Sequence, residues 1–114
     1  MVSTSLIFFN WGVIEIKLKY LVNVGVRMEN SDFWLIRRGS LDKLGKPVYT
    51  YYREHIGIKV VSPYLLPTYL YYAMLNLYNH KYWIYNSYGS TNLKHIRVED
   101  IRNLNIGGYR KIKI

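Results

Sequence analysis

The chain has 114 residues, enough for one hydrophobic core but not for two, so we expect a single domain over residues 1–114. Hydrophobic residues make up 50% of it, which excludes a disordered chain, and its formal net charge of +9 favours an anionic partner, nucleic acid before an acidic protein or a membrane surface. The absence of cysteine excludes disulfides and thiolate metal sites and predicts a reducing, cytoplasmic location.

The amino-terminal part reads as strands. It is apolar over Leu6–Phe9 but has no basic leader, and polar residues interrupt it too soon for a signal peptide or a spanning helix, so we expect no membrane partner. Apolar and polar residues alternate over Val13–Val22, which predicts a half-buried strand. The alternation continues to Val26 through Gly25, where a bend or bulge is expected, and a turn follows over 29–32.

A basic loop follows the next predicted strand, Phe33–Ile36. Residues 37–47 read RRGSLDKLGKP, with glycines as turning points and a proline as a stop. Adjacent residues of an extended chain point to opposite faces, so at most one of Arg37 and Arg38 faces a given groove. The same loop is compatible with a solvated hairpin tip. Two further strands are predicted, over Val48–Tyr52 and Ile56–Val61.

The principal helical region is predicted over residues 62–88. Pro67 suits a first helical turn, because its missing N–H would have no partner there. Apolar residues then recur every three or four positions, which predicts a stripe facing the core. The stripe comprises Leu70, Met74, Leu77 and Ile84, with Lys81 snorkelling out of it.

A polar loop and a short helix are predicted over Gly89–Ile106, GSTNLKHIRVEDIRNLNI. Gly89 permits a sharp turn, so that the polar side chains after it are exposed. Apolar residues every third position from Val98 predict a one-sided helix, with acids in its first turn as the helix dipole favours. The last residues, Ile112–Ile114, alternate as a short strand. These elements predict an α+β fold with a mixed or antiparallel twisted sheet, one principal helical region and a short carboxy-terminal helix.

Motifs for catalysis are missing from the sequence. It has no P-loop, dinucleotide fingerprint, GxSxG elbow or HExxH helix, and its histidines lack zinc-ligand spacing. We therefore expect a non-catalytic protein without cofactor or metal, although the sequence leaves Ser-His-acid catalysis open. The enzymatic alternative is a metal-dependent nuclease. It would have to use Asp32, Asp42, Glu54 and Lys59, whose spacing matches no compact motif.

The loops carry the residue types that bind nucleic acid. Lys and Arg neutralise phosphates, Arg and Asn make paired hydrogen bonds to base edges, and Ser and Thr bind either. The chain also has 13 tyrosines, whose rings can stack on unpaired bases, so RNA is an alternative ligand. The candidate contacts are Arg37, Arg38, Lys43, Lys46, Ser90, Thr91, Asn92, Lys94, His95 and Arg97.

Three segments occur in a specific order: FWLIRRGSLDKLGKP, YLYYAMLNL and GSTNLKHIRVEDIRNLNI. In this order they resemble the target recognition domains in the DNA specificity subunits of type I restriction-modification enzymes, with the strand and Arg-Gly loop first, then the Tyr-rich helix, the Gly-Ser/Thr loop and the closing Leu-x-Ile segment. The resemblance covers residues 33–106. It implies a DNA-reading domain that works beside a separate methyltransferase, with Arg37, Arg38 and the Ser90–Asn92 loop as contacts on double-stranded DNA.

The sequence also departs from that family. Its members usually continue with a proline-containing stretch and a long spacer helix, whereas this sequence continues with GGYRKIKI. We therefore expect the protein to act alone, as a homodimer or as a decoy, with a methyltransferase or another protein as a further partner. The alternative function is a protein-interaction factor that engages a defence complex by mimicking the restriction-like fold.

Overall fold

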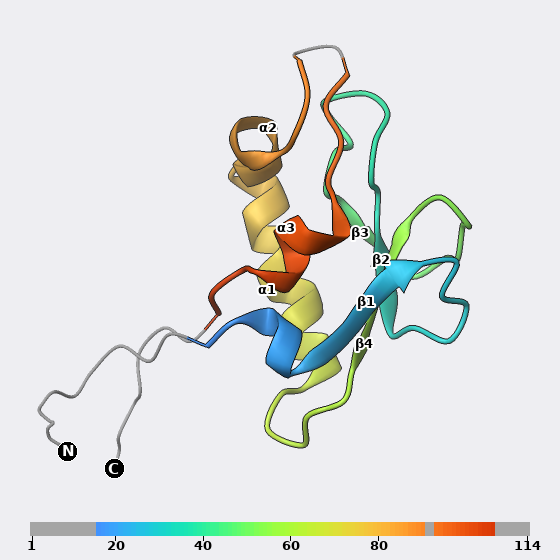
Figure 1. The fold of residues 1–114 in the computed structure, drawn as a ribbon, viewed down its shortest axis with the longest axis vertical. Helices are drawn as coiled ribbons and strands as arrows, with labels where there is room; N and C mark the ends of the chain where they lie inside the picture. The colour runs from blue at the N-terminus through green and yellow to red at the C-terminus, as the bar shows by residue number, and fades with distance from the viewer. Residues whose placement is uncertain (1–15, 91–92, 107–114) are drawn as a thin grey trace, which may run out of the picture.

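A four-stranded antiparallel sheet forms one layer of the structure, a computed structural model that describes residues 16–90 and 93–106 (Figure 1). The strands lie in the order β1-β4-β2-β3, and helices pack against one side of them. The expected α+β class with an antiparallel sheet is therefore confirmed. The strands are β1 (Val22–Val26), β2 (Phe33–Leu35), β3 (Pro47–Val48) and β4 (Ile56–Val60).

The central strand β4 is covered on both faces. Ile56 and Ile58 are fully buried in the core between the sheet and the helices. Gly57 points to the other face, where a Cβ atom would lie 2.3 Å from the Oγ atom of Ser31 in the preceding turn. A side chain at Gly57 would displace that turn, so the glycine lets the turn close over the sheet.

The strand predicted over Val13–Val22 is wrong in its described part. Leu18–Tyr20 forms a 3-10 turn, η1, and residues 13–15 lie outside the described residues. The backbone N–H of Leu18 donates to the carbonyl of Leu104 at 2.8 Å, which turns Leu18 into the core and leaves Tyr20 exposed. The expected bulge at Gly25 is also absent, since β1 pairs with β4 residue for residue through that position.

Strand β3 is shorter than predicted. It covers Pro47–Val48 instead of Val48–Tyr52, and Pro47 is part of the strand instead of a stop before it. Proline is tolerated there because β3 is an edge strand. The chain leaves the sheet at Tyr49, whose ring stacks on Tyr71 with the centroids 4.3 Å apart.

The helices occur where they were predicted, with one break. Pro67 begins the main helix as expected, and the short carboxy-terminal helix is present with Ile101 and Leu104 buried. Among the described residues, none of the helices combines the length and the apolar character needed to cross a membrane. The strand predicted over Ile112–Ile114 lies outside the described residues. The helices are α1 (Pro67–Asn79), α2 (Tyr82–Asn86) and α3 (Val98–Arg102).

The apolar stripe of the main helix does not continue to Lys81 and Ile84. Lys81 has a left-handed backbone with φ 61° and separates α1 from α2, so its side chain is exposed and does not snorkel from a continuous helix. The turn brings Trp83, not Ile84, into the core. Trp83 packs on Gly45, at which a Cβ atom would lie 2.0 Å from the indole Cδ1 atom.

Candidate nucleic-acid interface

Two basic segments that are far apart in the sequence meet at the upper end of the molecule in Figure 1. The backbone N–H of Ile96 donates to the carbonyl of Arg37 at 2.9 Å, and Arg38 forms an antiparallel bridge with His95. On its other side His95 exchanges two hydrogen bonds with Tyr88, at 2.9 and 3.0 Å. We call segments 37–46 and 88–97 together the basic end.

Glycines shape both segments of the basic end. Gly89 has φ 106°, and a Cβ atom there would lie 2.5 Å from the carbonyl oxygen of Leu93, so only glycine fits the turn that was predicted at this position. Gly45 has φ 84° and touches Trp83, as described above. The two loops are therefore fixed by close contacts at both glycines, with the indole of Trp83 at Gly45 and with the backbone of Leu93 at Gly89.

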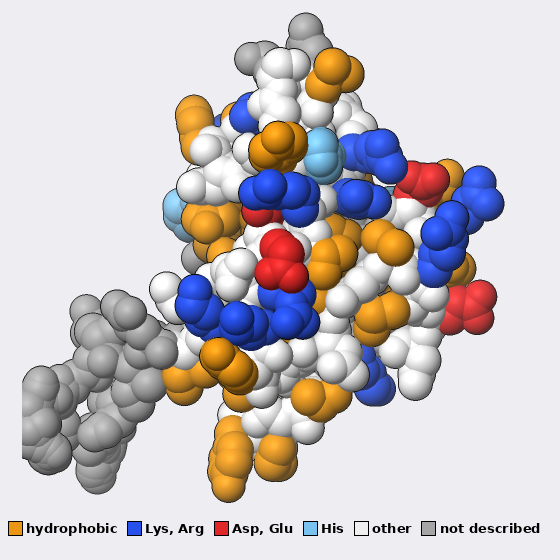
Figure 2. All heavy atoms as spheres, in the orientation of Figure 1, with side chains coloured by type: hydrophobic (Ala, Val, Ile, Leu, Met, Phe, Trp, Pro, Cys, Tyr) orange, Lys and Arg blue, Asp and Glu red, His pale blue; other side chains and the backbone are white. Residues whose placement is uncertain are grey.

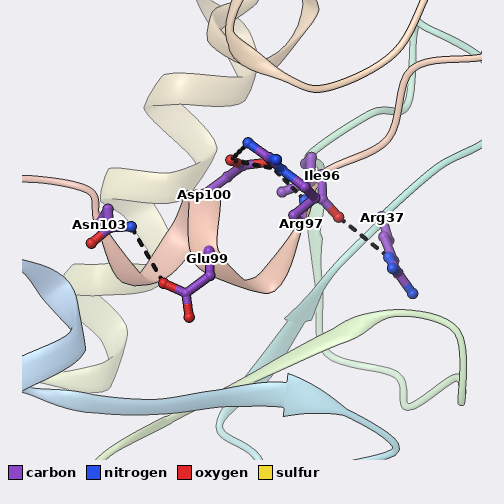
Figure 3. A network of polar contacts seen from close by, with 6 residues as sticks. All are labelled: Arg37, Ile96, Arg97, Glu99, Asp100 and Asn103. Atoms are coloured by element: carbon purple, nitrogen blue, oxygen red, sulfur yellow. Dashed lines mark hydrogen bonds and ion pairs between the residues drawn. The ribbon is translucent and has the colours of Figure 1, made fainter.

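The two adjacent arginines have different partners. The Nε–H group of Arg37 donates to the carbonyl of Ile96 at 3.3 Å, and Figure 3 shows the rest of its guanidinium pointing away from α3. Arg38 forms an ion pair with Glu54 at 3.0 Å, and both side chains are largely exposed. Exposed pairs of this kind contribute about 0 to 1 kcal/mol, so Arg38 can exchange Glu54 for another anion at little cost.

Arg97 is held more firmly than the other arginines. Its guanidinium donates to both carboxylate oxygens of Asp100, at 2.9 to 3.3 Å (Figure 3). It also lies over the ring of Tyr88, with 4.4 Å to the centroid. The hydrogen bond to Asp100 raises the pKa of Arg97. Burial would raise the pKa of Asp100, but the hydrogen bonds and charge of Arg97 bring that pKa below its usual value. Arg97 thus joins α3 to the hairpin around Tyr88.

The other candidate contacts lie within the same two segments. Lys94 and His95 are half-buried, and the ring of His95 meets the ring of Tyr88 edge-on at 5.6 Å. Lys43 and Lys46 are exposed on the loop after Gly39, and Ser90 is exposed at the tip of the hairpin. Thr91 and Asn92 lie outside the described residues.

Positive charge dominates the basic end. Its two segments contain six Lys or Arg residues and one acid, Asp42. A hydrogen bond from Ser40 lowers the pKa of Asp42, so this carboxylate stays charged beside Lys43. Glu54 and Asp100, from outside the segments, pair with two of the six cations. Figure 2 shows Lys and Arg side chains spread across the middle of the visible face, with acidic side chains beside some of them.

Sequence reasoning did not connect Tyr88, Glu54 or Asp100 with the basic residues, and it considered Glu54 only as a nuclease carboxylate. Tyr88 contacts both Arg97 and His95, and its position directly before the turning Gly89 is the signal that could have singled it out. Asp100 was assigned only to the helix dipole. The sequence could have indicated a capping role for Asp100, because an acidic residue three positions after the N-cap often accepts the backbone N–H of the N-cap residue. The carboxylate of Asp100 does accept the N–H of Arg97, at 2.8 Å.

The carboxylates considered for a nuclease do not come together. Asp32 accepts the backbone N–H of Val60 and pairs with Lys59, whereas Glu54 pairs with Arg38. Asp42 lies on the loop of the basic end. Over residues 16–90 and 93–106, no three His, Cys, Asp or Glu side chains group as metal ligands would.

Comparison with protein-family models, with curated proteins and with solved structures found no match to this chain. The resemblance to target recognition domains therefore stands on the three sequence segments alone.

Proposed function

We propose that the protein binds double-stranded DNA through the basic end, without catalysing a reaction. The observation that carries the proposal is the pairing of the Arg37–Arg38 segment with the Lys94–Arg97 segment. These two segments were the separate candidates for DNA contact in the sequence, and the fold joins them by backbone hydrogen bonds. Juxtaposed cationic segments on loops fit the phosphate backbone, which supplies most of the affinity in non-specific DNA binding.

The chemistry divides the basic end into two parts. Arg37, Lys94, Lys43 and Lys46 have no acidic partner within 4 Å among the described residues, so they are available to phosphates. Arg97 is already engaged by Asp100 and Tyr88, which makes it a support for the hairpin and not a base-reading side chain. The hairpin that Tyr88 and His95 form by their two backbone hydrogen bonds is the part that would enter a groove.

The order of the three sequence segments supports a more specific proposal, sequence-specific DNA binding. Because these segments resemble a target recognition domain, the hairpin would read bases while the lysines of the 37–46 loop bind the phosphate backbone of the DNA. In that case a methyltransferase subunit would be a further partner. Binding of one duplex sequence far above random duplexes, measured by selection from a random library, would support the narrower form.

The test is the salt dependence of affinity for a duplex. If the basic end neutralises about six phosphates, the logarithm of the association constant should fall with the logarithm of salt concentration with a slope of about −5. A slope near zero would contradict DNA binding as the main activity. Competition among duplex DNA, single-stranded DNA and RNA in the same assay identifies the preferred ligand, and a clear preference for RNA would replace the duplex proposal by the RNA alternative.

A further inference from the structure

The end of the molecule opposite the basic end exposes large apolar side chains. Tyr64 is 94% exposed, Leu66 71% and Tyr20 70%. Exposed patches of this kind on a small protein mark surfaces for interaction. We call the set the tyrosine tip; it consists of Tyr20, Val61, Tyr64, Leu66 and Tyr69.

Backbone hydrogen bonds bring the two parts of the tyrosine tip together. The N–H groups of Val61 and Ser62 both donate to the carbonyl of Leu21, at 3.0 and 3.1 Å, so the loop after β4 lies beside the residue that follows Tyr20. The hydroxyl of Ser62 accepts the N–H of Tyr64 and holds the loop in a turn. In Figure 1 this loop is the lowest point of the described chain, and Figure 2 shows hydrophobic side chains projecting there. The tip is convex.

Positive charge lies at the base of the tyrosine tip. Lys17 and Lys19 flank it on the chain, and the ammonium group of Lys19 lies 5.4 Å from the ring centroid of Tyr20. Residues 16–28 and 55–98 contain no acid, and Glu99 on α3, which packs against η1, is paired with Arg102 at 3.2 Å. Asp32 approaches Val60 from the neighbouring strand, but it is paired with Lys59. An anionic surface would therefore meet cations around the apolar side chains.

We propose that the tyrosine tip binds the surface of an anionic phospholipid bilayer, with Tyr64 and Leu66 entering the interface and Lys17 and Lys19 contacting headgroups. A convex knob fits a bilayer, which deforms around it, whereas a protein partner would need a matching hollow. Tyrosine suits this location, because its ring is apolar and its hydroxyl remains in contact with water and headgroups. Nearby lysines add attraction to anionic lipid.

Binding to a bilayer differs from the prediction from the sequence, which was that the protein has no membrane partner. That expectation rested on the lack of an apolar span in the sequence, whereas binding to a membrane surface needs only a few exposed apolar side chains and nearby positive charge. The tip also lies at the other end of the molecule from the basic end, so it is independent of the proposed DNA binding.

The experiment is flotation of the full-length chain with vesicles of phosphatidylcholine and phosphatidylglycerol, compared with vesicles of phosphatidylcholine alone. We expect binding to the mixed vesicles that weakens as salt is raised. The double variant Tyr64→Ser, Leu66→Ser should bind about tenfold less, because it removes the inserting side chains. Both side chains are exposed, so the variant should fold, which circular dichroism checks. Tyr85→Ser, a 78% exposed tyrosine on α2, is the matched control and should bind as the parent does.

Charge variants complete the test. Lys17→Gln with Lys19→Gln should weaken binding to the mixed vesicles several-fold, whereas Arg53→Gln with Lys81→Gln, which removes the same charge elsewhere, should weaken it less. The proposal is overturned if the chain does not float with either vesicle, or if the Tyr64 and Leu66 double variant floats as well as the parent. It is also overturned if the chain binds a purified protein through the tip and does not bind the vesicles.

Discussion

At the basic end two of the arginines and both loop glycines are held by contacts within the fold, whereas at the tyrosine tip large side chains have little packed against them. Arg37 and Arg97 each donate hydrogen bonds within the fold, Gly45 lies against the indole of Trp83, and Gly89 lies against the backbone of Leu93. In contrast, Tyr64 keeps 94% of its surface exposed. The described part of the chain therefore presents held arginines at one end, where Tyr88 and Leu93 are also exposed, and an adaptable apolar surface at the other.

This difference matters for binding. Ordering a long side chain on binding costs about 0.5 to 1.5 kcal/mol, and side chains already held in place avoid part of that cost. A fixed polar surface suits a ligand with regular spacing, such as the phosphates of a duplex. Exposed apolar side chains suit a soft surface that adapts to them.

Gly45→Ala should destabilise the fold strongly. The new methyl group would overlap the indole of Trp83, and alanine is strained at φ 84°, so we expect the free energy of unfolding to fall by about 2 to 4 kcal/mol. The matched change at the tyrosine tip, Leu66→Ala, should alter it by less than about 0.5 kcal/mol, because that side chain is exposed. Urea unfolding followed by tryptophan fluorescence measures both. Equal effects would show that the two ends do not differ in packing.

Arg97→Ala should act on stability more than on DNA recognition. It removes the ion pair with Asp100 and the contact with Tyr88, so the free energy of unfolding should fall. Asp100→Asn should lower it by a similar amount at neutral pH. Because the pKa of Asp100 is depressed in the fold, its contribution is present above the unfolded pKa of about 3.9 and is lost as pH falls through the lower folded pKa.

Measurements of DNA binding test whether Arg97 supports the hairpin or reads bases. After correction for the unfolded fraction, Arg97→Ala should reduce affinity by the same factor on all duplex sequences. Loss of discrimination at a single base pair would instead make Arg97 a base-reading residue and would remove its assignment as a support.

Mild acid should weaken the fold through His55. Burial lowers the pKa of His55, and its Nδ1 atom is buried without a hydrogen-bond partner among the described residues. The unfolded chain therefore binds the proton more readily, so stability is complete above pH about 6.5 and declines as pH falls below it, by at most about 1.4 kcal/mol per pH unit for one group. Unfolding at pH 7 and pH 5.5 measures the decline. The decline should disappear in His55→Asn and persist in the exposed control His80→Asn.

Local patterns in the sequence predicted much of the fold. Alternation located β2 and β4, Pro67 located the start of α1, and the three-residue spacing after Arg97 located α3. The misses came from contacts between distant residues. Leu18 turns because it bonds to Leu104, and β3 ends early because Tyr49 stacks on Tyr71. Neither partner can be identified from spacing along the chain.

The same limit applies to the candidate interface. The residue types and the turn at Gly89 were readable from the sequence, but the pairing of Arg37 with Ile96 was not, because 59 positions separate them. The engagement of Arg97 by Tyr88 and Asp100 could not be predicted either, since it depends on how the hairpin meets α3. The exposure of the tyrosines was equally hidden, because tyrosine is common both in cores and on surfaces.

The central claim is that DNA binds specifically at the basic end, and that the net positive charge of the whole chain does not by itself account for binding. It is tested most directly by comparing two variants that each lose two charges, Arg37→Gln with Lys94→Gln at the basic end and Lys17→Gln with Lys19→Gln at the tyrosine tip. Fluorescence anisotropy of one labelled duplex is measured over a range of salt concentrations. The first variant should bind about tenfold more weakly with a salt slope shallower by about 2, while the second keeps the parent slope. Equal losses in the two variants would contradict the claim.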